Sequence, residues 1–215
     1  ITNGCRRFTG IETANGRISA ERAMLATGVQ TNLLLGWLGV YIPMTTPLVS
    51  ALQTIPITTS LGPVIGVANG DLAVRQQIDG RVRFTGGAEQ LKANLDLSGE
   101  YPVVHPPAAS IAQVISSVSS ILPFVSKTPI CRIWGGLLDL TPDALPVLDC
   151  VPTVEGLFVA AGFSGHGFGI APAVGEVMGN KILGKKTSIP LDAFSFNRFG
   201  NRSEALKTSR PTLHG

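Results

Sequence analysis

The chain has 215 residues; 44% are hydrophobic, only 14% are charged, and the formal net charge is +3. This composition excludes intrinsic disorder, which requires low hydrophobicity and high charge, and it also excludes coiled-coil and collagen-like chains. The small basic excess of 17 Lys and Arg over 14 Asp and Glu does not favour nucleic-acid binding. An ordinary soluble surface carries more charge, so the low charge of this chain is a feature that its function must explain.

The amino-terminal segment predicts a β-hairpin followed by a short helix. Residues 7–14 and 17–25 flank Asn15-Gly16, a strong signal for a tight hairpin turn. The second strand becomes apolar, so it is expected to enter a buried sheet. It ends at Ala26-Thr27-Gly28, and leucine spacing predicts a helix over residues 30–38.

The middle of the chain predicts a sheet with one covering helix. Short β-like runs are expected at residues 63–67, 72–78, 81–85 and 129–140. A tight turn at Asp79-Gly80 joins the second and third runs, Gly86-Gly87 ends the hairpin, and residues 88–107 read as a loop. Apolar residues recur at three-to-four spacing over 108–125, which predicts an amphipathic helix.

The carboxyl-terminal part predicts strand, glycine-rich turn and helix in succession. Apolar runs at Val147-Leu148 and 157–161 read as strands, and a helix is expected over 171–183. From Lys185 onward the polar chain is expected to loop over the surface. Three cysteines, at positions 5, 131 and 150, have no metal-like spacing, so we expect reduced thiols that are buried as small hydrophobes.

The sequence predicts neither a membrane-spanning helix nor a signal peptide. No stretch reaches the roughly 18 apolar residues that a spanning helix needs, and residues 1–7 are polar and basic. A cytoplasmic location is therefore expected, either free or peripheral at the inner face of the membrane.

The best candidate site is the segment from Gly162 to Gly169, which has four glycines in eight residues. A glycine-rich turn between a strand and a helix lets backbone N–H groups approach a ligand, and the helix N-terminus favours negative charge. A plain structural turn remains open as an alternative. A hydrolase using Ser164 and His166 is disfavoured, because His166 stands where a nucleophile elbow requires glycine.

A second candidate site lies on the predicted strand 129–140. Alternation places Arg132, Trp134 and Gly136 on one face of that strand. Trp134 beside two glycines could wall a pocket for a flat ligand, although a core position is equally compatible with the pattern. The sequence shows no paired acids, phosphate loop or zinc spacing, so no metal site is expected.

Four stretches, taken in order, resemble the carboxyl-terminal part of the FAD-dependent amine and amino-acid oxidoreductases, the superfamily of D-amino-acid oxidase, glycine oxidase and sarcosine oxidase. The stretches are Gly16–Gly28, Trp134–Leu148, Gly156–Gly175 and Phe194–Phe199. The third is nearly the flavin loop and helix of this family. Within the superfamily, the chain looks most like the flavin subunits of heteromeric dehydrogenases acting on opines, proline, hydroxyproline or glycine.

This resemblance implies a mixed α/β (α+β) fold with two domains. Residues 1–43 and 145–190 would be the remainder of a Rossmann-like FAD-binding domain. Residues 44–144 would form a substrate domain with a mixed, largely antiparallel sheet, and residues 191–215 would be a tail.

The resemblance also implies FAD as a non-covalent cofactor. Ala26, Thr27 and Gly28 would lie beside its diphosphate and ribose. The ribityl chain and flavin ring would be wrapped by Gly162, Phe163, Ser164, Gly165, His166, Gly167, Phe168 and Gly169. The cysteine that tethers flavin in sarcosine oxidases falls at Gly136, so covalent attachment there is not expected.

The implied reaction transfers hydride from the amine-bearing carbon of an amine, amino acid or opine to the flavin, and water then hydrolyses the imine. The candidates for the substrate pocket are Trp134, Arg132, Arg75 and His166. Leu138 stands where related enzymes often have an arginine that grips the substrate carboxylate. Arg75 and Arg132 are possible substitutes, because an unpaired carboxylate in a closed site binds poorly.

Members of this family begin with a Gly-x-Gly-x-x-Gly unit that holds the FAD pyrophosphate and that this sequence lacks. The chain also has no initiating Met, so we expect a fragment or cleaved piece of a longer subunit. Its partners would be the missing amino-terminal half and other subunits of a heteromeric dehydrogenase. The alternative is a non-catalytic remnant that serves as an assembly module and binds a partner subunit.

Overall fold

The computed structural model describes residues 6–67, 72–90 and 103–200. The predictions on Cys5, on most of the loop at 88–107 and on the tail beyond residue 200 lie outside these ranges. The chain divides into two compact units, which within the described ranges comprise residues 6–45 with 139–200, and residues 46–138. The predicted roles of these parts as FAD and substrate domains stay predictions.

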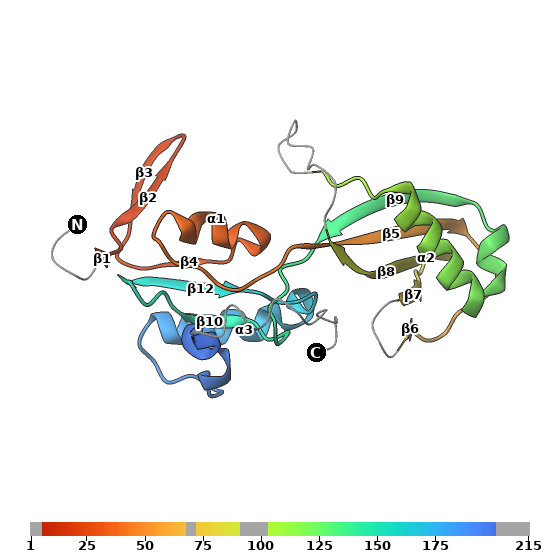
Figure 1. The fold of residues 1–215 in the computed structure, drawn as a ribbon. Coiled ribbons are helices and arrows are strands. Elements are labelled where there is room, and N and C mark those ends of the chain that lie inside the picture. Colours follow the sequence, from red (N-terminus) through yellow and green to blue (C-terminus); the bar gives the residue numbers. More distant parts are fainter. Residues whose placement is uncertain (1–5, 68–71, 91–102, 201–215) are drawn as a thin grey trace. The chain divides into compact units, whose positions relative to one another are not determined.

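The first unit is built on a three-stranded sheet between two helices (Figure 1). The strands are β4 (Ala23–Leu25), β10 (Val147–Cys150) and β12 (Leu157–Ala161), and the helices are α1 (Thr31–Gly36) and α3 (Gly167–Ile182). β12 lies between a parallel β4 and an antiparallel β10. Val159 and Ala161 pack in one cluster with Leu35 of α1, whereas Ala160 packs with Met178 of α3. The alternation along β12 therefore buries both of its faces.

Short elements extend this unit. β2 (Gly10–Thr13) and β3 (Gly16–Ser19) form the predicted hairpin around Asn15-Gly16, and β1 (Arg6–Arg7) runs parallel to β11 (Val154–Glu155). The predicted strand 17–25 is divided, because the chain leaves the hairpin after Ser19 and re-forms as β4 in another sheet. The predicted helix over 30–38 consists of a 3-10 turn, Gly28–Gln30, and the shorter α1.

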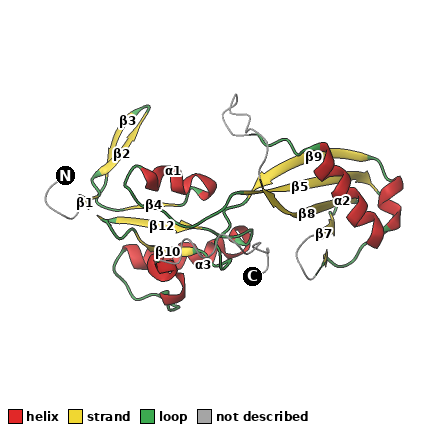
Figure 2. Cartoon of the chain, in the orientation of Figure 1, coloured by secondary structure: helices red, strands yellow, loops and turns green. Residues whose placement is uncertain are grey.

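The second unit is a five-stranded antiparallel sheet with a helix on one face (Figures 1 and 2). The strands are β5 (Pro47–Pro56), β6 (Ile65–Gly66), β7 (Leu72–Gln76), β8 (Arg81–Gln90) and β9 (Ile130–Leu137), in the order β6-β7-β8-β5-β9. α2 (Ala108–Ile121) packs Val114 and Val118 against Leu52, Val74 and Phe84 of the sheet. The mixed α/β fold predicted from the sequence is confirmed.

Two predicted boundaries in this unit were wrong. β8 does not end at Gly86-Gly87 but continues to Gln90. Its pairing with β5 shifts register between Val49 and Ala51, opposite this glycine pair, so a bulge absorbs the irregularity. The predicted helix over 108–125 ends at Ile121, and a 3-10 helix that begins at Pro123 follows it.

Three further predictions also need correction. α3 begins at Gly167, inside the glycine-rich segment, rather than at residue 171. The segment after Lys185 is not only a surface loop, because Phe199 is buried in the core and Phe196 packs against it, after a 3-10 turn at Asp192–Phe194. Cys131 and Cys150 are free thiols, but both are exposed rather than buried. Within the described ranges, no helix is both long and apolar enough to cross a bilayer.

Candidate functional site

The glycine-rich segment makes a sharp turn between β12 and α3. Gly162, Ser164 and Gly165 have φ values of 76°, 53° and 87°, in the left-handed region that favours glycine. A Cβ added at Gly162 would lie 2.4 Å from Cγ2 of Thr141. Glycine is therefore required at position 162 both for its backbone conformation and for the close approach of Thr141.

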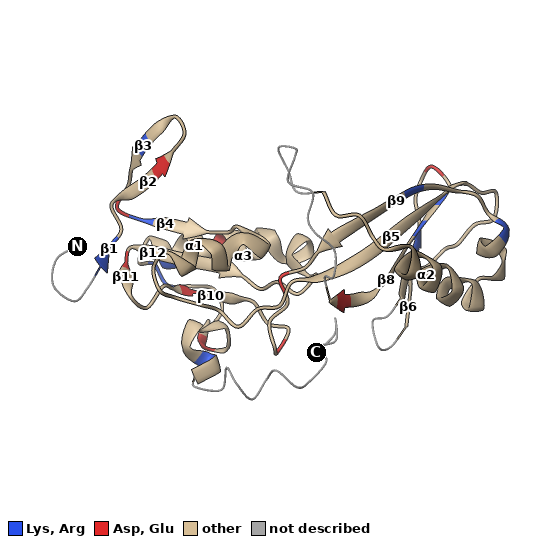
Figure 3. Cartoon of the chain, turned by 45° about the horizontal axis from the view of Figure 1, so that its top comes forward, with Lys and Arg blue, Asp and Glu red and all other residues tan. Residues whose placement is uncertain are grey.

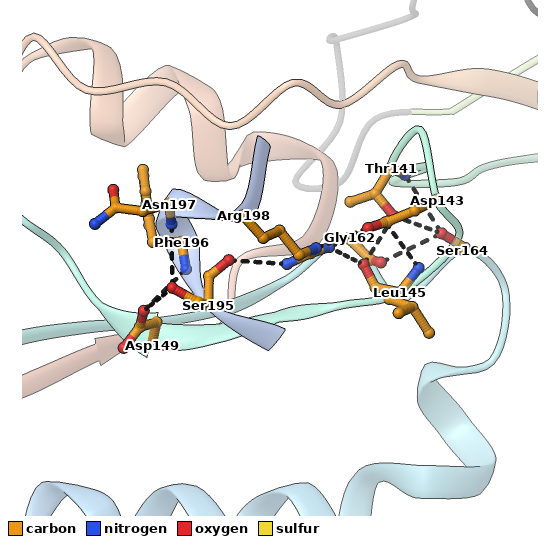
Figure 4. A network of polar contacts seen from close by, with 10 residues as sticks. All are labelled: Thr141, Asp143, Leu145, Asp149, Gly162, Ser164, Ser195, Phe196, Asn197 and Arg198. Carbon is orange, nitrogen blue, oxygen red and sulfur yellow. Dashed lines mark hydrogen bonds and ion pairs between the residues drawn. The ribbon is translucent and has the colours of Figure 1, made fainter. Parts of the chain in front are cut away.

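Asp139 and Thr141 hold this turn from inside the protein. Figure 4 shows Thr141 beside Gly162 and Ser164. Gly162 N–H donates to Oδ2 of Asp139 at 2.8 Å, and Ser164 N–H donates to the Asp139 carbonyl at 3.1 Å. The Ser164 hydroxyl accepts from Thr141 N–H at 3.3 Å and lies 3.3 Å from Oγ1 of Thr141. Because these bonds satisfy the buried polar groups, the turn keeps one conformation.

The buried hydroxyl contradicts the hydrolase alternative. Ser164 has no exposed surface, and its hydroxyl contacts Thr141 and the carbonyl of Gly162. A nucleophile must be open to its substrate and activated by a base. Ser164 is therefore a structural residue, whose left-handed conformation is stabilised by these contacts.

The turn leads directly into the amino terminus of α3. The N-cap residue, His166, makes no side-chain cap to this helix, and its first turn contains no acidic residue. The first N–H groups of a helix have no partner within the helix, and the dipole of this 16-residue helix favours negative charge beside them. Phe168 is 97% exposed, and a Cβ built on Gly169 would meet nothing within 4 Å. The arrangement suits a ligand that presents oxygen acceptors to backbone N–H groups.

The second predicted cofactor segment lies at the same edge of the sheet. Ala26, Thr27 and Gly28 follow the carboxyl end of β4, and the glycine-rich turn follows the carboxyl end of β12. Since β4 and β12 are parallel neighbours, both segments lie at one edge, the usual ligand-binding edge of open α/β sheets. Gly28 has φ 53°, and a Cβ there would also meet nothing within 4 Å.

A clamp formed by Arg198 supports the segment that carries Asp139 and Thr141. The guanidinium binds both carboxylate oxygens of Asp143, at 2.8 and 3.1 Å, and donates to the Leu145 carbonyl at 2.6 Å (Figure 4). Burial would raise the pKa of Asp143, but hydrogen bonds from Arg198 and from Leu145 N–H lower it below its ordinary value. The segment that carries Arg198 therefore fixes the turn around Asp143, which follows the residues that support the glycine-rich loop.

Asp149 ties three parts of the first unit together. Its carboxylate accepts from Nζ of Lys181 in α3 at 2.7 Å, from Phe196 N–H at 2.9 Å and from Cys150 N–H at 2.8 Å. Burial alone would raise the pKa of Asp149, but these hydrogen bonds outweigh it and lower the pKa to about 2. Sequence reasoning gave Asp149 no role, because its partners lie 32 and 47 residues away.

The predicted substrate residues of the second unit share the face of the sheet opposite α2. Arg132, Trp134 and Gly136 are paired with Gln53, Ala51 and Val49, which confirms that the three lie on one face. Arg75 and Trp134 line a hollow of about 300 Å³ on that face, and the Arg132 guanidinium lies 5.8 Å from the Trp134 ring centroid. His166 belongs to the first unit and does not line this hollow.

Sequence reasoning missed Asp139, Thr141 and Arg83. Asp139 is a single acid between Leu138 and Leu140, and an acid in an apolar run is a signal for a buried polar contact. Arg83 lines the same hollow as Arg75, and strand alternation from Arg75 across the Asp79-Gly80 turn could have placed it there.

Comparison with models of protein families shows to which family the chain belongs. The model for the family described as "FAD dependent oxidoreductase" matches residues 2–180. The chain belongs to the FAD-dependent oxidoreductase family. Three known proteins illustrate the similarity within it. The sarcosine oxidase beta subunit of Rhizobium meliloti (strain 1021) is 22% identical over 97% of this chain and 49% of its own length. The corresponding subunit of Rhodobacter capsulatus is 26% identical over 90% of this chain and 44% of its own length.

The third relative is a solved structure, the L-proline dehydrogenase from P. horikoshii. It has a TM-score of 0.79 and 27% identity, over 91% of this chain and 51% of its own. The chain therefore spans about half the length of the curated relatives and solved structures it matches. The glycine oxidase from Geobacillus kaustophilus, at 19% identity and a TM-score of 0.75, shares the fold.

The residues at the first unit's ligand edge fit FAD, the cofactor of this family. The ring carbonyls of a flavin are acceptors, and the amino terminus of α3 offers N–H donors that the His166 side chain does not cap. Gly169 leaves open space beside the first turn. The Gly162–Gly165 turn is held by Asp139 and Thr141, so it would not have to be ordered by the ligand.

Proposed function

We propose that this chain is part of an FAD-dependent oxidoreductase that oxidises the C–N bond of an amine, amino acid or opine by hydride transfer to flavin. The observation that carries the proposal is the internally locked turn from Gly162 to Gly165, which leads into an amino terminus of α3 without a side-chain cap. Family membership supports the same reaction class.

FAD is held non-covalently in this proposal. Backbone N–H groups of residues 167–169 would bind the carbonyl end of the flavin ring. Ala26, Thr27 and Gly28 would border the diphosphate and ribose. Position 136 carries glycine, so it offers no side chain for a covalent link.

Bound FAD would supply the two-electron acceptor that amine oxidation requires. The contribution of this chain is positioning and electrostatics. The N–H donors and dipole of α3 stabilise negative charge at the ligand, and they do so without reorganisation because Asp139 and Thr141 fix the preceding turn. Phe163, packed against Gly167, helps to fix the first turn of this helix.

The proposed partners are a missing amino-terminal half with the nucleotide-binding unit, and further subunits of a heteromeric dehydrogenase. Leu33, Trp37 and Tyr41, in and after α1, are each more than 60% exposed. Neighbouring apolar side chains exposed to this degree are typical of surface that another polypeptide covers. The heteromeric part of the proposal is supported by the similarity to sarcosine oxidase beta subunits.

A second candidate function is a non-catalytic assembly module. It is favoured by Leu138, which places an uncharged side chain where related enzymes often hold the substrate carboxylate. Such a module would bind its partner subunit and would show no flavin reduction by any amine.

The test of the flavin proposal uses two glycines of α3. A methyl group at Gly169 would enter the open space beside the first turn of α3 without touching this chain. Gly175 lies six residues further along the same helix, and a methyl group there would likewise meet nothing within 4 Å, so it is the control away from the first turn. Assembled with the amino-terminal half, the wild-type protein is expected to retain FAD through purification. Gly169→Ala should weaken FAD binding at least tenfold, and Gly175→Ala should leave it within twofold.

Both substitutions replace glycine by a better helix former, so each is expected to preserve or raise the melting temperature. Bound flavin is measured by its visible absorbance per chain, and folding by thermal unfolding. A Gly169→Ala protein that binds FAD as tightly as wild type, or a wild-type assembly without FAD, contradicts the proposed cofactor site.

A further inference from the structure

Two arginines face each other on the open face of the second unit's sheet. Arg75 of β7 and Arg83 of β8 are directly paired in the antiparallel register. Arg75 is exposed and Arg83 is partly exposed. Like charges directly opposite each other on neighbouring strands destabilise a sheet. Within the described residues neither guanidinium has an ion pair, so their repulsion is not offset inside this part of the chain.

Both arginines line the hollow that also contains Trp134. Its volume of about 300 Å³ is the size of a small metabolite site. Ala51, Ala73 and Trp134 give it an apolar wall, and Thr85 contributes a hydroxyl next to Arg83 on the same face of β8. The hollow therefore combines two positive charges with a surface on which a short carbon chain can lie.

The two acidic residues that the structure describes on these strands and their turns, Asp79 and Glu89, already have other partners. Asp79, at the turn between β7 and β8, pairs with Arg81. Glu89, at the far end of β8, accepts hydrogen bonds from Ser50 at 3.4 Å and from Ser110 of α2 at 2.8 Å. Figure 3 shows basic segments, coloured blue, on the strands of this sheet. Arg132, beside Trp134, adds a third positive charge to the same face.

We propose that Arg75 and Arg83 form a binding site for a small dicarboxylate in this hollow. Each guanidinium can form a bidentate, charge-assisted pair with one carboxylate, and two negative charges remove the repulsion between the arginines. The carbon chain of the ligand would lie against Trp134, Ala51 and Ala73. The two arginines would supply the positive charge for a carboxylate that is absent at position 138, where this chain has leucine.

This site defines the substrate class as an amino compound that carries two carboxylates. The assignment of a substrate class rests on the proposed function, whereas the proposal that the hollow binds a dicarboxylate does not. The test therefore measures binding without flavin or turnover. Failure of the flavin proposal would leave the binding result intact, and failure of dicarboxylate binding would leave flavin binding intact.

The experiment compares glutarate with valerate by calorimetry on the whole chain at low ionic strength. The two probes have five carbons and differ by one carboxylate. Glutarate is expected to bind at least tenfold more tightly. Arg75→Gln and Arg83→Gln should each weaken glutarate binding about tenfold or more, with a much smaller effect on valerate.

Arg81→Gln is the matched control, because Arg81 is on the same strand as Arg83 but pairs with Asp79 outside the hollow. It should change glutarate affinity less than twofold. Thermal unfolding separates binding from folding, since Arg75→Gln relieves a like-charge contact and should not lower the melting temperature. Equal affinity for the two probes, no glutarate binding, or an equal loss in Arg81→Gln overturns the proposal.

Discussion

Asp149 shows how one carboxylate joins distant segments of the first unit. It accepts hydrogen bonds from α3, from the segment after the 3-10 turn at Asp192–Phe194 and from its own strand end. Its side chain and that of Lys181 are only 18% and 25% exposed, so this ion pair is less screened than an ordinary surface pair. The carboxylate is therefore a stabilising element of the first unit.

The depressed pKa of Asp149 predicts acid sensitivity. Its pKa is about 2 in the folded chain against an ordinary value of 3.8, so the folded state favours the ionised form. The resulting stabilisation, about 1–2 kcal/mol, is fully present above pH 4 and is lost as pH falls from about 4 to 2. Asp149→Asn should lower the melting temperature by several degrees at neutral pH, and the difference should shrink across this window.

Thermal unfolding from pH 7 to pH 2 checks this prediction. Glu176→Gln is the control, because Glu176 is an exposed acid on α3 and has no partner among the described residues. If Asp149→Asn and Glu176→Gln shifted the melting temperature equally at neutral pH, the stabilising role of Asp149 would be refuted.

At the scale of elements, the packing of α2 on its sheet depends on Gly86. A Cβ at Gly86 would lie 2.5 Å from Cγ2 of Val114, a buried residue of α2. This close approach explains why β8 continues through a glycine pair that sequence rules interpret as a strand end. The glycine allows the helix to pack tightly on the strand rather than ending it.

Gly86→Ala is therefore expected to destabilise the second unit. The added methyl group would force α2 away from β8 or move Val114 off its rotamer, at a cost of about 1–3 kcal/mol. Gly136→Ala in β9 is the control, since a Cβ there would meet nothing within 4 Å. Chemical denaturation measures both. Equal unfolding free energies for the two variants would contradict this explanation of Gly86.

At the scale of the whole molecule, the sequence predicted elements better than contacts. The Asn15-Gly16 hairpin, the amphipathic α2 and the face shared by Arg132 and Trp134 follow from turn chemistry and periodicity, which are local properties. The glycine-rich segment was found because glycine density is also visible locally. The contacts that support this segment could not be found from the sequence, because Asp139 and Thr141 each lie 23 residues before the residue that they contact in the loop.

Glycine also illustrates why a residue type alone does not define a role. Glycine is needed at position 162 because of the backbone conformation and the close approach of Thr141. Glycine is needed at position 86 because α2 packs closely against it. Gly169 is helical and free of contacts, so the described chain gives no packing reason for it. Only the structure separates these cases, and it concentrates the flavin proposal on Gly169 and the first turn of α3.

The comparison with relatives suggests a physical reason for the low charge of the chain. The chain spans about half their length, and apolar side chains after β4 are exposed. We attribute the exposed apolar side chains to surface that the proposed partner polypeptide covers. In the account proposed above, this chain would supply the flavin loop and a carboxylate-binding face, and the proposed partner polypeptide would supply the pyrophosphate-binding unit.

The most direct test of this account is the visible absorption spectrum of the chain assembled with its amino-terminal half, recorded without oxygen before and after addition of an amine substrate. Candidate substrates are amino acids, opines and amino dicarboxylates. The account predicts a flavin spectrum that is bleached by at least one of them, because hydride transfer reduces the bound cofactor. A folded assembly that carries no flavin, or flavin that none of these compounds bleaches, would contradict it.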